Sequence, residues 1–216
     1  MSIEAVIFDL DGVIVSTDEF HYRAWKELAV SIDIPFDRAI NERLRGVSRM
    51  ESLDIILEKA RHTYCKEEKE ALADAKNERY RVMLNELTPQ NILPGILALL
   101  DDLSKRGIKI AIGSSSKNAR FILSRIGLET RFDAVADGNL IRNSKPDPEV
   151  FLLAVEMMGI PAVRCAVIED ATAGIDAAIA AGCKAVAVGA AANSASAHYS
   201  VKTPGDIEIE ELIKEI

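Results

Sequence analysis

The chain has 216 residues, of which 49% are hydrophobic and 28% are charged, and its net charge at pH 7 is −8. A chain of this size and composition can bury a substantial core, which excludes an intrinsically disordered protein. The acidic balance is not reversed by any long basic block, so we expect neither nucleic acid nor an anionic membrane surface as a partner.

The three cysteines are widely spaced and form no CxxC pair, which argues against structural zinc and against a disulfide framework. No apolar run is long enough to span a membrane, and the first residues carry no basic segment typical of a secretion signal. We therefore expect a cytoplasmic protein.

The first apolar run, AVIF at residues 5–8, predicts a strand. From about residue 17 to residue 87 the sequence has only helical patterns, in which apolar residues lie opposite charged ones. Helices are predicted at residues 18–31, 49–62 and 66–87. A crossover between parallel strands needs one helix, so several helices in this segment predict an inserted helical domain.

The segment TPQNILPG at residues 88–95 has the proline and glycine residues of a linker that returns the chain to the sheet. Near-continuous apolar runs after it are typical of parallel strands that are buried on both faces. These strands are predicted at residues 108–112, 132–136, 165–168 and 185–188. The predicted fold is a doubly wound α/β core, residues 1–16 and 88–216, with an all-helical domain at residues 17–87.

Carboxylates, hydroxyls and a lysine follow the predicted strands. In sheets of this kind the ligand lies beyond the carboxyl ends of the strands, so we expect these side chains to converge at one edge. They are Asp9 and Asp11 after the first strand, Ser114, Ser115, Ser116, Lys117 and Asn118 after the second, Lys145 after the third, and Glu169 and Asp170 after the fourth.

Acidic side chains crowded at one edge would repel one another unless a cation lay between them. Mg²⁺ prefers carboxylate and carbonyl oxygens, completed by water and substrate phosphate. We therefore predict one Mg²⁺, held by Asp9, Asp170 and the backbone carbonyl of Asp11, with Glu169 as a further ligand or as a support. The alternative is that each carboxylate is solvated or caps the next helix.

Asp9 and Asp11 can divide the work of phosphoryl transfer. Asp9 stays ionised and attacks phosphorus, while Asp11 holds a proton for the leaving oxygen, and Gly12 allows a tight turn behind them. Ser114 and Lys145 are suited to bind the oxygens of the transferring phosphoryl group. A solvated surface position is the alternative for Lys145.

In four motifs the sequence resembles the haloacid dehalogenase superfamily: FDLDGV, the serines at 114–116, Lys145 in KPDP, and the ED pair at 169–170. The resemblance covers essentially the whole chain. It implies a Rossmann-like core, Mg²⁺, Asp9 as nucleophile and Asp11 as general acid and base. It also implies that the helical insert is a cap that closes over the site.

Within this superfamily, the segments EFHYRAWK, LRGVSRMESL, SSSKNA and NSKPDPE resemble the β-phosphoglucomutase subgroup. That resemblance implies interconversion of β-D-glucose 1-phosphate and glucose 6-phosphate through a phosphoaspartate and glucose 1,6-bisphosphate, which is both intermediate and activator. It implies substrate contacts from His21, Trp25, Arg45, Gly46, Val47, Arg49, Ser52, Lys76, Ser115, Ser116, Lys117 and Asn118.

The residues themselves are compatible with these roles. A bisphosphate needs two anion sites, and the guanidinium of Arg49 is suited to bind the phosphate that is not being transferred. Asn118 and the backbone N–H groups after Ser114 lie where a helix is expected to begin, which is an anion-binding position. The alternatives are a solvated Arg49, a surface Lys76, and purely structural roles for His21 and Trp25.

Two positions depart from the subgroup: Arg45 replaces a common lysine, and Ser16 replaces an aspartate that usually precedes the hinge residue, here Thr17. Both bear on sugar preference and on cap movement. A sugar-phosphate phosphatase shares the first half-reaction with a mutase and is the alternative function. A non-catalytic module would have lost acidic or basic motif residues, which are all present. We expect a monomer that acts on a small phosphosugar.

Overall fold

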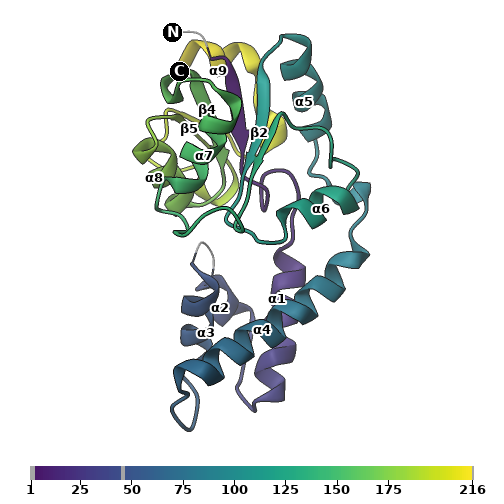
Figure 1. Cartoon of the computed structure of the whole chain (residues 1–216), viewed down its shortest axis with the longest axis vertical. Coiled ribbons are helices and arrows are strands. Elements are labelled where there is room, and N and C mark those ends of the chain that lie inside the picture. Colours follow the sequence, from purple (N-terminus) through teal and green to yellow (C-terminus); the bar gives the residue numbers. More distant parts are fainter. Residues whose placement is uncertain (1–2, 45–46, 216) are drawn as a thin grey trace. The chain divides into compact units, whose positions relative to one another are not determined.

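The computed structural model describes residues 3–44 and 47–215 (Figure 1). The chain forms two compact units. We call Met1–Ser16 with Thr88–Ile216 the core unit, and Thr17–Leu87 the helical unit.

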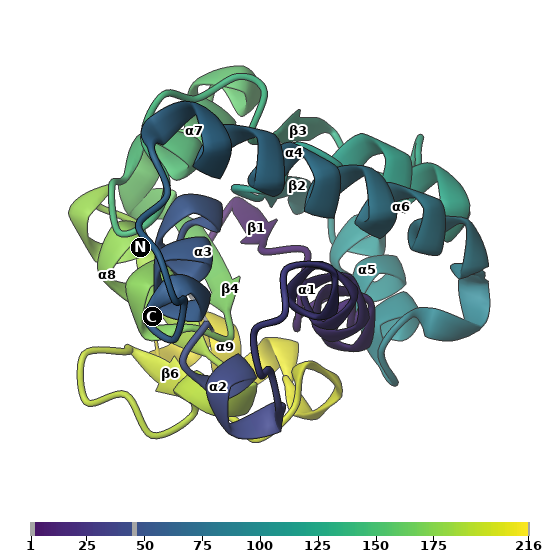
Figure 2. The same ribbon diagram turned by 90° about the horizontal axis from the view of Figure 1, so that it is seen from below.

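The core unit is built on a six-stranded sheet with the order β3-β2-β1-β4-β5-β6, in which every pairing of neighbours is parallel. Figure 2 shows β1 with β2 on one side and β4 on the other. Ile7 of β1 is paired with Ala111 of β2 and with Val167 of β4. The strands are β1 (Ala5–Phe8), β2 (Lys109–Gly113), β3 (Ala134–Ala136), β4 (Cys165–Glu169), β5 (Lys184–Ala187) and β6 (Tyr199–Ser200).

Helices cover both faces of this sheet, which explains why its strands are apolar in nearly every residue. On one face, alternate strand residues such as Ile7 and Val167 pack with Phe151 of α7 and Ile175 of α8. On the other face, α5 packs against β2 and contacts α9 (Figure 1). The helices are α5 (Ile96–Lys105), α6 (Ala119–Arg125), α7 (Glu149–Met158), α8 (Thr172–Ala180) and α9 (Ile209–Glu215), with 3-10 turns at Pro89–Asn91, Ala162–Arg164, Gly189–Ala191 and Pro204–Asp206.

The helical unit has a small apolar core of its own. Trp25 and Leu28 pack with Leu53, Ile56 and Ala73, all of which are buried. These residues come from three helices, of which α4 packs against both α1 and α3. The helices are α1 (Asp18–Ser31), α2 (Arg38–Glu42), α3 (Arg49–Leu57) and α4 (Lys66–Met83), followed by a 3-10 turn at Leu84–Glu86.

Both ends of the helical insert are tied together. Within the helical unit, the guanidinium of Arg23 donates to both carboxylate oxygens of Glu86, at 2.8 and 3.0 Å. Within the core unit, Val15 forms an antiparallel bridge with Ile92, and the backbone N–H next to Ile92 donates to Ile14 O at 2.9 Å. The two segments that flank the insert are therefore hydrogen-bonded to each other within the core unit.

The predicted strands and the parallel α/β class are confirmed, with strand ends displaced by one or two residues. The helix predicted at residues 49–62 is too long, since α3 ends at Leu57. The residues that follow are mostly exposed, so they have little apolar surface that a longer helix could bury. The helix predicted at 66–87 gives way to a 3-10 turn after Met83. Helix α2 was not predicted because Ile40 is its only buried residue and so leaves no periodic pattern.

None of the helices in the described ranges combines the length and the apolar character that a membrane span requires.

The packing of Gly113 yields a stability prediction. A Cβ atom at Gly113 would lie 2.7 and 2.8 Å from two ring atoms of Phe151 and 3.0 Å from Ile7 Cγ2. Gly113→Ala should therefore lower the free energy of unfolding by about 1–3 kcal/mol. Phe151→Leu makes room at this point, so the double variant should lose less than the sum of the two single losses. Urea unfolding of all four proteins measures the coupling, and strictly additive losses would contradict this packing.

Candidate active site

Three carboxylates meet at the carboxyl ends of β1 and β4. These two strands are neighbours, with Phe8 paired to Ile168, so the residues that follow them lie side by side. One side-chain oxygen from each of Asp9, Glu169 and Asp170 lies within 4.8 Å of the others. Asp9 is 7% exposed and Glu169 is 2% exposed. The predicted convergence of the first and fourth motifs is therefore present.

Lys145 provides the positive charge that this acidic group needs. Its Nζ donates to Asp9 Oδ1 at 2.5 Å and to Glu169 Oε2 at 2.7 Å, and it lies 4.6 Å from the centroid of the Phe151 ring. Its side chain is 11% exposed, which rules out the solvated surface position. Burial by itself lowers the pKa of Lys145, but the charges of Asp9 and Glu169 outweigh it and raise that pKa, so the lysine stays protonated.

Both carboxylate oxygens of Glu169 are held by hydrogen bonds. Its Oε1 accepts the backbone N–H groups of Asp170 and Ala171 at 3.1 Å, while its Oε2 accepts from Lys145. Burial raises the pKa of Glu169 to about 8, and the charges of Asp9 and Asp170 add to the effect despite the opposing charge of Lys145. Burial and the neighbouring carboxylates therefore make the charged form of Glu169 costly, and Lys145 offsets part of that cost.

The donor set fits a hard divalent cation such as Mg²⁺, because three carboxylates each offer an oxygen within 4.8 Å of the others. Asp9 and Asp170 are the residues that would hold it, since both oxygens of Glu169 already accept hydrogen bonds. Among the described residues, the carboxylate of Asp11 is not a member of this group. Its predicted contribution through the backbone carbonyl stays a prediction.

Two glycines allow these carboxylates to sit so close to the backbone. Gly12 has a φ of 82°, and a Cβ atom there would lie 2.1 Å from Asp170 Oδ2. A Cβ atom at Gly174, at the start of α8, would lie 2.0 Å from the carboxyl carbon of Glu169. The turn at Gly12 was predicted, whereas Gly174 was missed, although it follows the ED pair closely in the sequence.

The residues after β2 form a compact loop, which we call the serine loop (Ser114–Asn118). Ser114 is buried, and its Oγ accepts the N–H of Ser116, whose own Oγ accepts the N–H of Asn118, both at 3.2 Å. The Oγ of Ser115 is buried and makes no hydrogen bond to the residues that the structure describes, while Lys117 is exposed. Helix α6 begins after Asn118 as predicted, and it has only seven residues.

A second group of predicted residues comes together within the helical unit. Lys76 Nζ lies 2.9 Å from His21 Nδ1 and 4.7 Å from the ring centroids of Trp25 and Tyr80. Lys76 is only 3% exposed, which excludes the surface alternative, and Trp25 also belongs to the apolar core of this unit. Burial lowers the pKa of His21 well below its usual value, and the charges of Lys76 and Arg49 lower it further. These effects favour the neutral imidazole, whose Nδ1 can accept a hydrogen bond from Lys76 in the tautomer protonated at Nε2.

Arg49 is the first residue of α3, and its guanidinium donates to Asn77 Oδ1 on α4 at 3.0 Å. Ser52 is buried in the same helix, and Val47 is 38% exposed. Arg45 and Gly46, which were also predicted to contact substrate, lie outside the described residues. Asn77 and Tyr80 were missed, although the helical spacing from Lys76 to Tyr80 could have indicated the latter.

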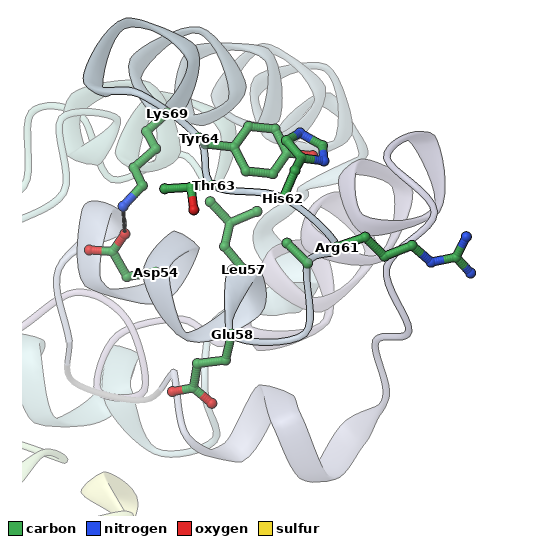
Figure 3. Close-up of a pocket in the computed structure, with 9 residues that line it drawn as sticks. Asp54, Leu57, Glu58, Arg61, His62, Thr63, Tyr64 and Lys69 are labelled. Carbon is green, nitrogen blue, oxygen red and sulfur yellow. Dashed lines mark hydrogen bonds and ion pairs between the residues drawn. The ribbon is translucent and has the colours of Figure 1, made fainter.

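A hollow of about 460 Å³ on the helical unit contains none of the predicted residues (Figure 3). Two of the charged groups around it, Lys69 and Asp54, are paired with each other at 2.7 Å. It is lined by Asp54, Leu57, Glu58, Ala60, Arg61, His62, Thr63, Tyr64 and Lys69. We therefore place the candidate active site at the carboxylates and Lys145.

Replacement of Lys145 by methionine tests the charge balance of the core unit. In metal-free buffer Lys145→Met should lose about 3–5 kcal/mol of unfolding free energy, because Asp9 and Glu169 lose their counter-charge. Saturating Mg²⁺ should recover part of this loss, so the melting temperature of the variant should rise with Mg²⁺ more than that of the parent. Thermal unfolding with EDTA and with Mg²⁺ measures both effects.

The matched control is Lys105→Met, since the side chain of Lys105 is 76% exposed on α5. This variant should change neither the stability nor its dependence on Mg²⁺. A Lys145→Met protein that is equally destabilised with and without Mg²⁺ would contradict a shared role of lysine and cation.

A family model described as haloacid dehalogenase-like hydrolase matches residues 3–182. The chain is 46% identical over 215 residues to the beta-phosphoglucomutase of Bacillus subtilis, and the match covers 99% of this chain and 95% of that protein. It is 32% identical over 185 residues to the phosphorylated carbohydrates phosphatase of Thermotoga maritima, covering 83% of this chain and 82% of that protein.

Among solved structures, the chain is similar to a beta-phosphoglucomutase from Clostridium difficile, with a TM-score of 0.90 and 42% identity. That match covers 99% of this chain and 96% of the other. The superfamily resemblance and the Rossmann-like fold expected from four short motifs are thereby confirmed. The chain belongs to the haloacid dehalogenase-like hydrolase family.

Proposed function

We propose that this protein is a β-phosphoglucomutase that interconverts β-D-glucose 1-phosphate and glucose 6-phosphate. The core unit is its catalytic domain and the helical unit is its cap. One observation carries the proposal: a chain that is 46% identical to a β-phosphoglucomutase along 99% of its length also brings Asp9, Lys145 and Asp170 together.

The reaction starts from an enzyme that is phosphorylated on Asp9, with glucose 1,6-bisphosphate as the activator that supplies the phosphoryl group. The C6 hydroxyl of β-glucose 1-phosphate attacks this phosphorus, the bond between phosphorus and the Asp9 oxygen breaks, and Asp11 accepts the hydroxyl proton. The product of this half is glucose 1,6-bisphosphate. Phosphoryl transfer of this kind depends mainly on positioning and on charge stabilisation.

In the second half the bisphosphate turns round. Asp9 attacks the phosphorus attached to the C1 oxygen, and Asp11 returns its proton to that oxygen as glucose 6-phosphate leaves. Because Lys145 binds Oδ1 of Asp9, we assign Oδ2 as the attacking oxygen. Ser114 and Lys145 hold the oxygens of the phosphoryl group in both halves. When bound, Mg²⁺ offsets the repulsion between the carboxylates and the phosphoryl oxygens.

The phosphate that is not being transferred needs a second anion site. We assign it to Arg49, with Ser116, Lys117 and Asn118 of the serine loop. A guanidinium already oriented by Asn77 loses less side-chain entropy when it binds phosphate than a freely rotating one. His21, Trp25 and Lys76 are proposed to contact the sugar, and Arg45, Gly46, Val47 and Ser52 to line the cap.

A sugar-phosphate phosphatase is the second candidate, and the similarity to the Thermotoga maritima phosphatase favours it. In that reaction water, rather than a sugar hydroxyl, takes the phosphoryl group from Asp9. The two candidates therefore share every core residue and differ in how well water is excluded.

One assay separates the two candidates. β-Glucose 1-phosphate is supplied with Mg²⁺ and a trace of glucose 1,6-bisphosphate, and glucose 6-phosphate and free phosphate are followed together. Glucose 6-phosphate should form with little free phosphate, and Asp9→Asn should abolish this turnover while remaining folded. Asp102→Asn, on the exposed side of α5, is the control and should keep full activity. Release of phosphate without isomerisation would select the phosphatase.

Arg49→Met should raise KM for β-glucose 1-phosphate by about 10- to 100-fold, because a charge-assisted contact to phosphate is worth roughly 1.5–3 kcal/mol. The affinity for Mg²⁺ should not change. Arg38→Met is the control, since Arg38 belongs to the same unit and its side chain is 60% exposed. An unchanged KM for Arg49→Met would assign the second phosphate to other residues.

A further inference from the structure

A second loop of the core unit lies directly against the serine loop. It follows β3 and consists of Asp137, Gly138 and Asn139, which we call the supporting loop. Gly113 at the end of β2 is paired with Ala136 at the end of β3, so the two loops leave the sheet side by side. The sequence motifs discussed above include no residue of the supporting loop.

Three hydrogen bonds join the end of β3 and the supporting loop to the serine loop. Ser114 N donates to Ala136 O at 3.1 Å, and Gly138 N donates to Ser116 O at 3.2 Å. The side-chain Nδ2 of Asn139 donates to Lys117 O at 2.9 Å. The backbone of the serine loop is thus held along most of its length by its neighbour.

The two loops also touch where no side chain would fit. A Cβ atom at Gly138 would lie 2.2 Å from Ser115 O and 2.9 Å from Lys117 N. These are backbone atoms, which cannot rotate out of the way as the end of a side chain can. Any side chain at position 138 must therefore displace the serine loop.

The supporting loop is itself anchored. Asp137 is 1% exposed, its Oδ1 accepts Asn139 N at 2.8 Å, and its Oδ2 is paired with Arg120 Nε at 3.2 Å. Arg120 also donates to Val135 O at 3.0 Å, so it connects α6, which follows the serine loop, to β3. Contacts of this kind fix the position of the supporting loop on both sides.

We propose that Asp137, Gly138 and Asn139 are positioning residues that hold the serine loop in its phosphate-binding conformation. They act through the backbone of Ser115, Ser116 and Lys117 and do not touch the substrate themselves. The inference rests on the proposed function insofar as the serine loop binds phosphate. A displacement of about 1 Å at such a site can cost on the order of a hundredfold in rate, so a supporting contact has a measurable effect.

The test uses the full chain, Mg²⁺ and inorganic phosphate as the probe. Gly138→Ala should weaken phosphate binding at least about tenfold, because it pushes the loop directly. Asn139→Ala removes one hydrogen bond and should weaken it about two- to tenfold. In the kinetic assay both variants should raise KM more than they lower kcat. The affinity for Mg²⁺, held at β1 and β4, should stay at the parent value.

Gly159→Ala is the matched control. Gly159 ends α7 with a φ of 67°, and a Cβ atom there would meet nothing within 4 Å. This variant loses stability through backbone strain, yet it should keep the parent affinity for phosphate. It separates a general loss of stability from displacement of the serine loop. Asn139→Ala, which adds no atoms, keeps the test decisive if Gly138→Ala fails to fold.

Parent affinity for phosphate in Asn139→Ala, or an equal loss of Mg²⁺ and phosphate binding, would overturn the positioning role. Because phosphate binding is measured without turnover, the outcome does not depend on which sugar is isomerised. If the parent binds phosphate but releases it from substrate by hydrolysis, the mutase proposal fails while the positioning role can still stand.

Discussion

Repulsion between carboxylates is the constraint on which the core unit depends. Asp9, Glu169 and Asp170 lie within 4.8 Å of one another, and two of the three are nearly inaccessible to water. Lys145, which lies far from these residues in the sequence, balances part of this charge. Its side chain is buried because the carboxylates that it contacts are buried. Carboxylate oxygens gathered this closely form a donor set for a divalent cation, and such a cation can also bind the oxygens of a phosphoryl group, so the crowding of charge and the proposed function have the same origin.

The rest of the site follows from the parallel sheet. β1, β2 and β4 are adjacent, so residues that are more than a hundred positions apart in the chain end at the same edge. Glycine is required where the backbone must approach a carboxylate or another loop, as at Gly12 and Gly138. In the core unit Lys145 is paired with carboxylates, whereas two cationic side chains of the helical unit have other neighbours. Lys76 lies beside the rings of Trp25 and Tyr80, and Arg49 donates to the side-chain amide of Asn77.

Much of this could be predicted because the signals are local. The apolar runs indicated the strands of the core except the short edge strand β6, and DxDG and the ED pair indicated Asp9 and Asp170 because strand ends of a parallel sheet converge. Contacts between distant segments left no local signal. Asn139 and Gly138 contact backbone atoms of the serine loop. Asn77 on α4 accepts a hydrogen bond from Arg49 on α3. The end of α3 depends on how little apolar surface follows Leu57, which periodicity alone does not report.

The paired ends of the helical insert have a consequence for folding. β1 is synthesised first, yet its partners β2 and β4 come only after the whole insert. If the insert folds by itself, Arg23 and Glu86 bring its two ends together. The entropy of joining β1 to β2 is then set by residues 9–16 and 88–108, which include α5, and no longer by the insert as well. During synthesis β1 can therefore remain unpaired until β2 and β4 emerge. Once the insert is compact, the late pairing of β1 with β2 adds little to the loop-closure entropy and so slows folding little.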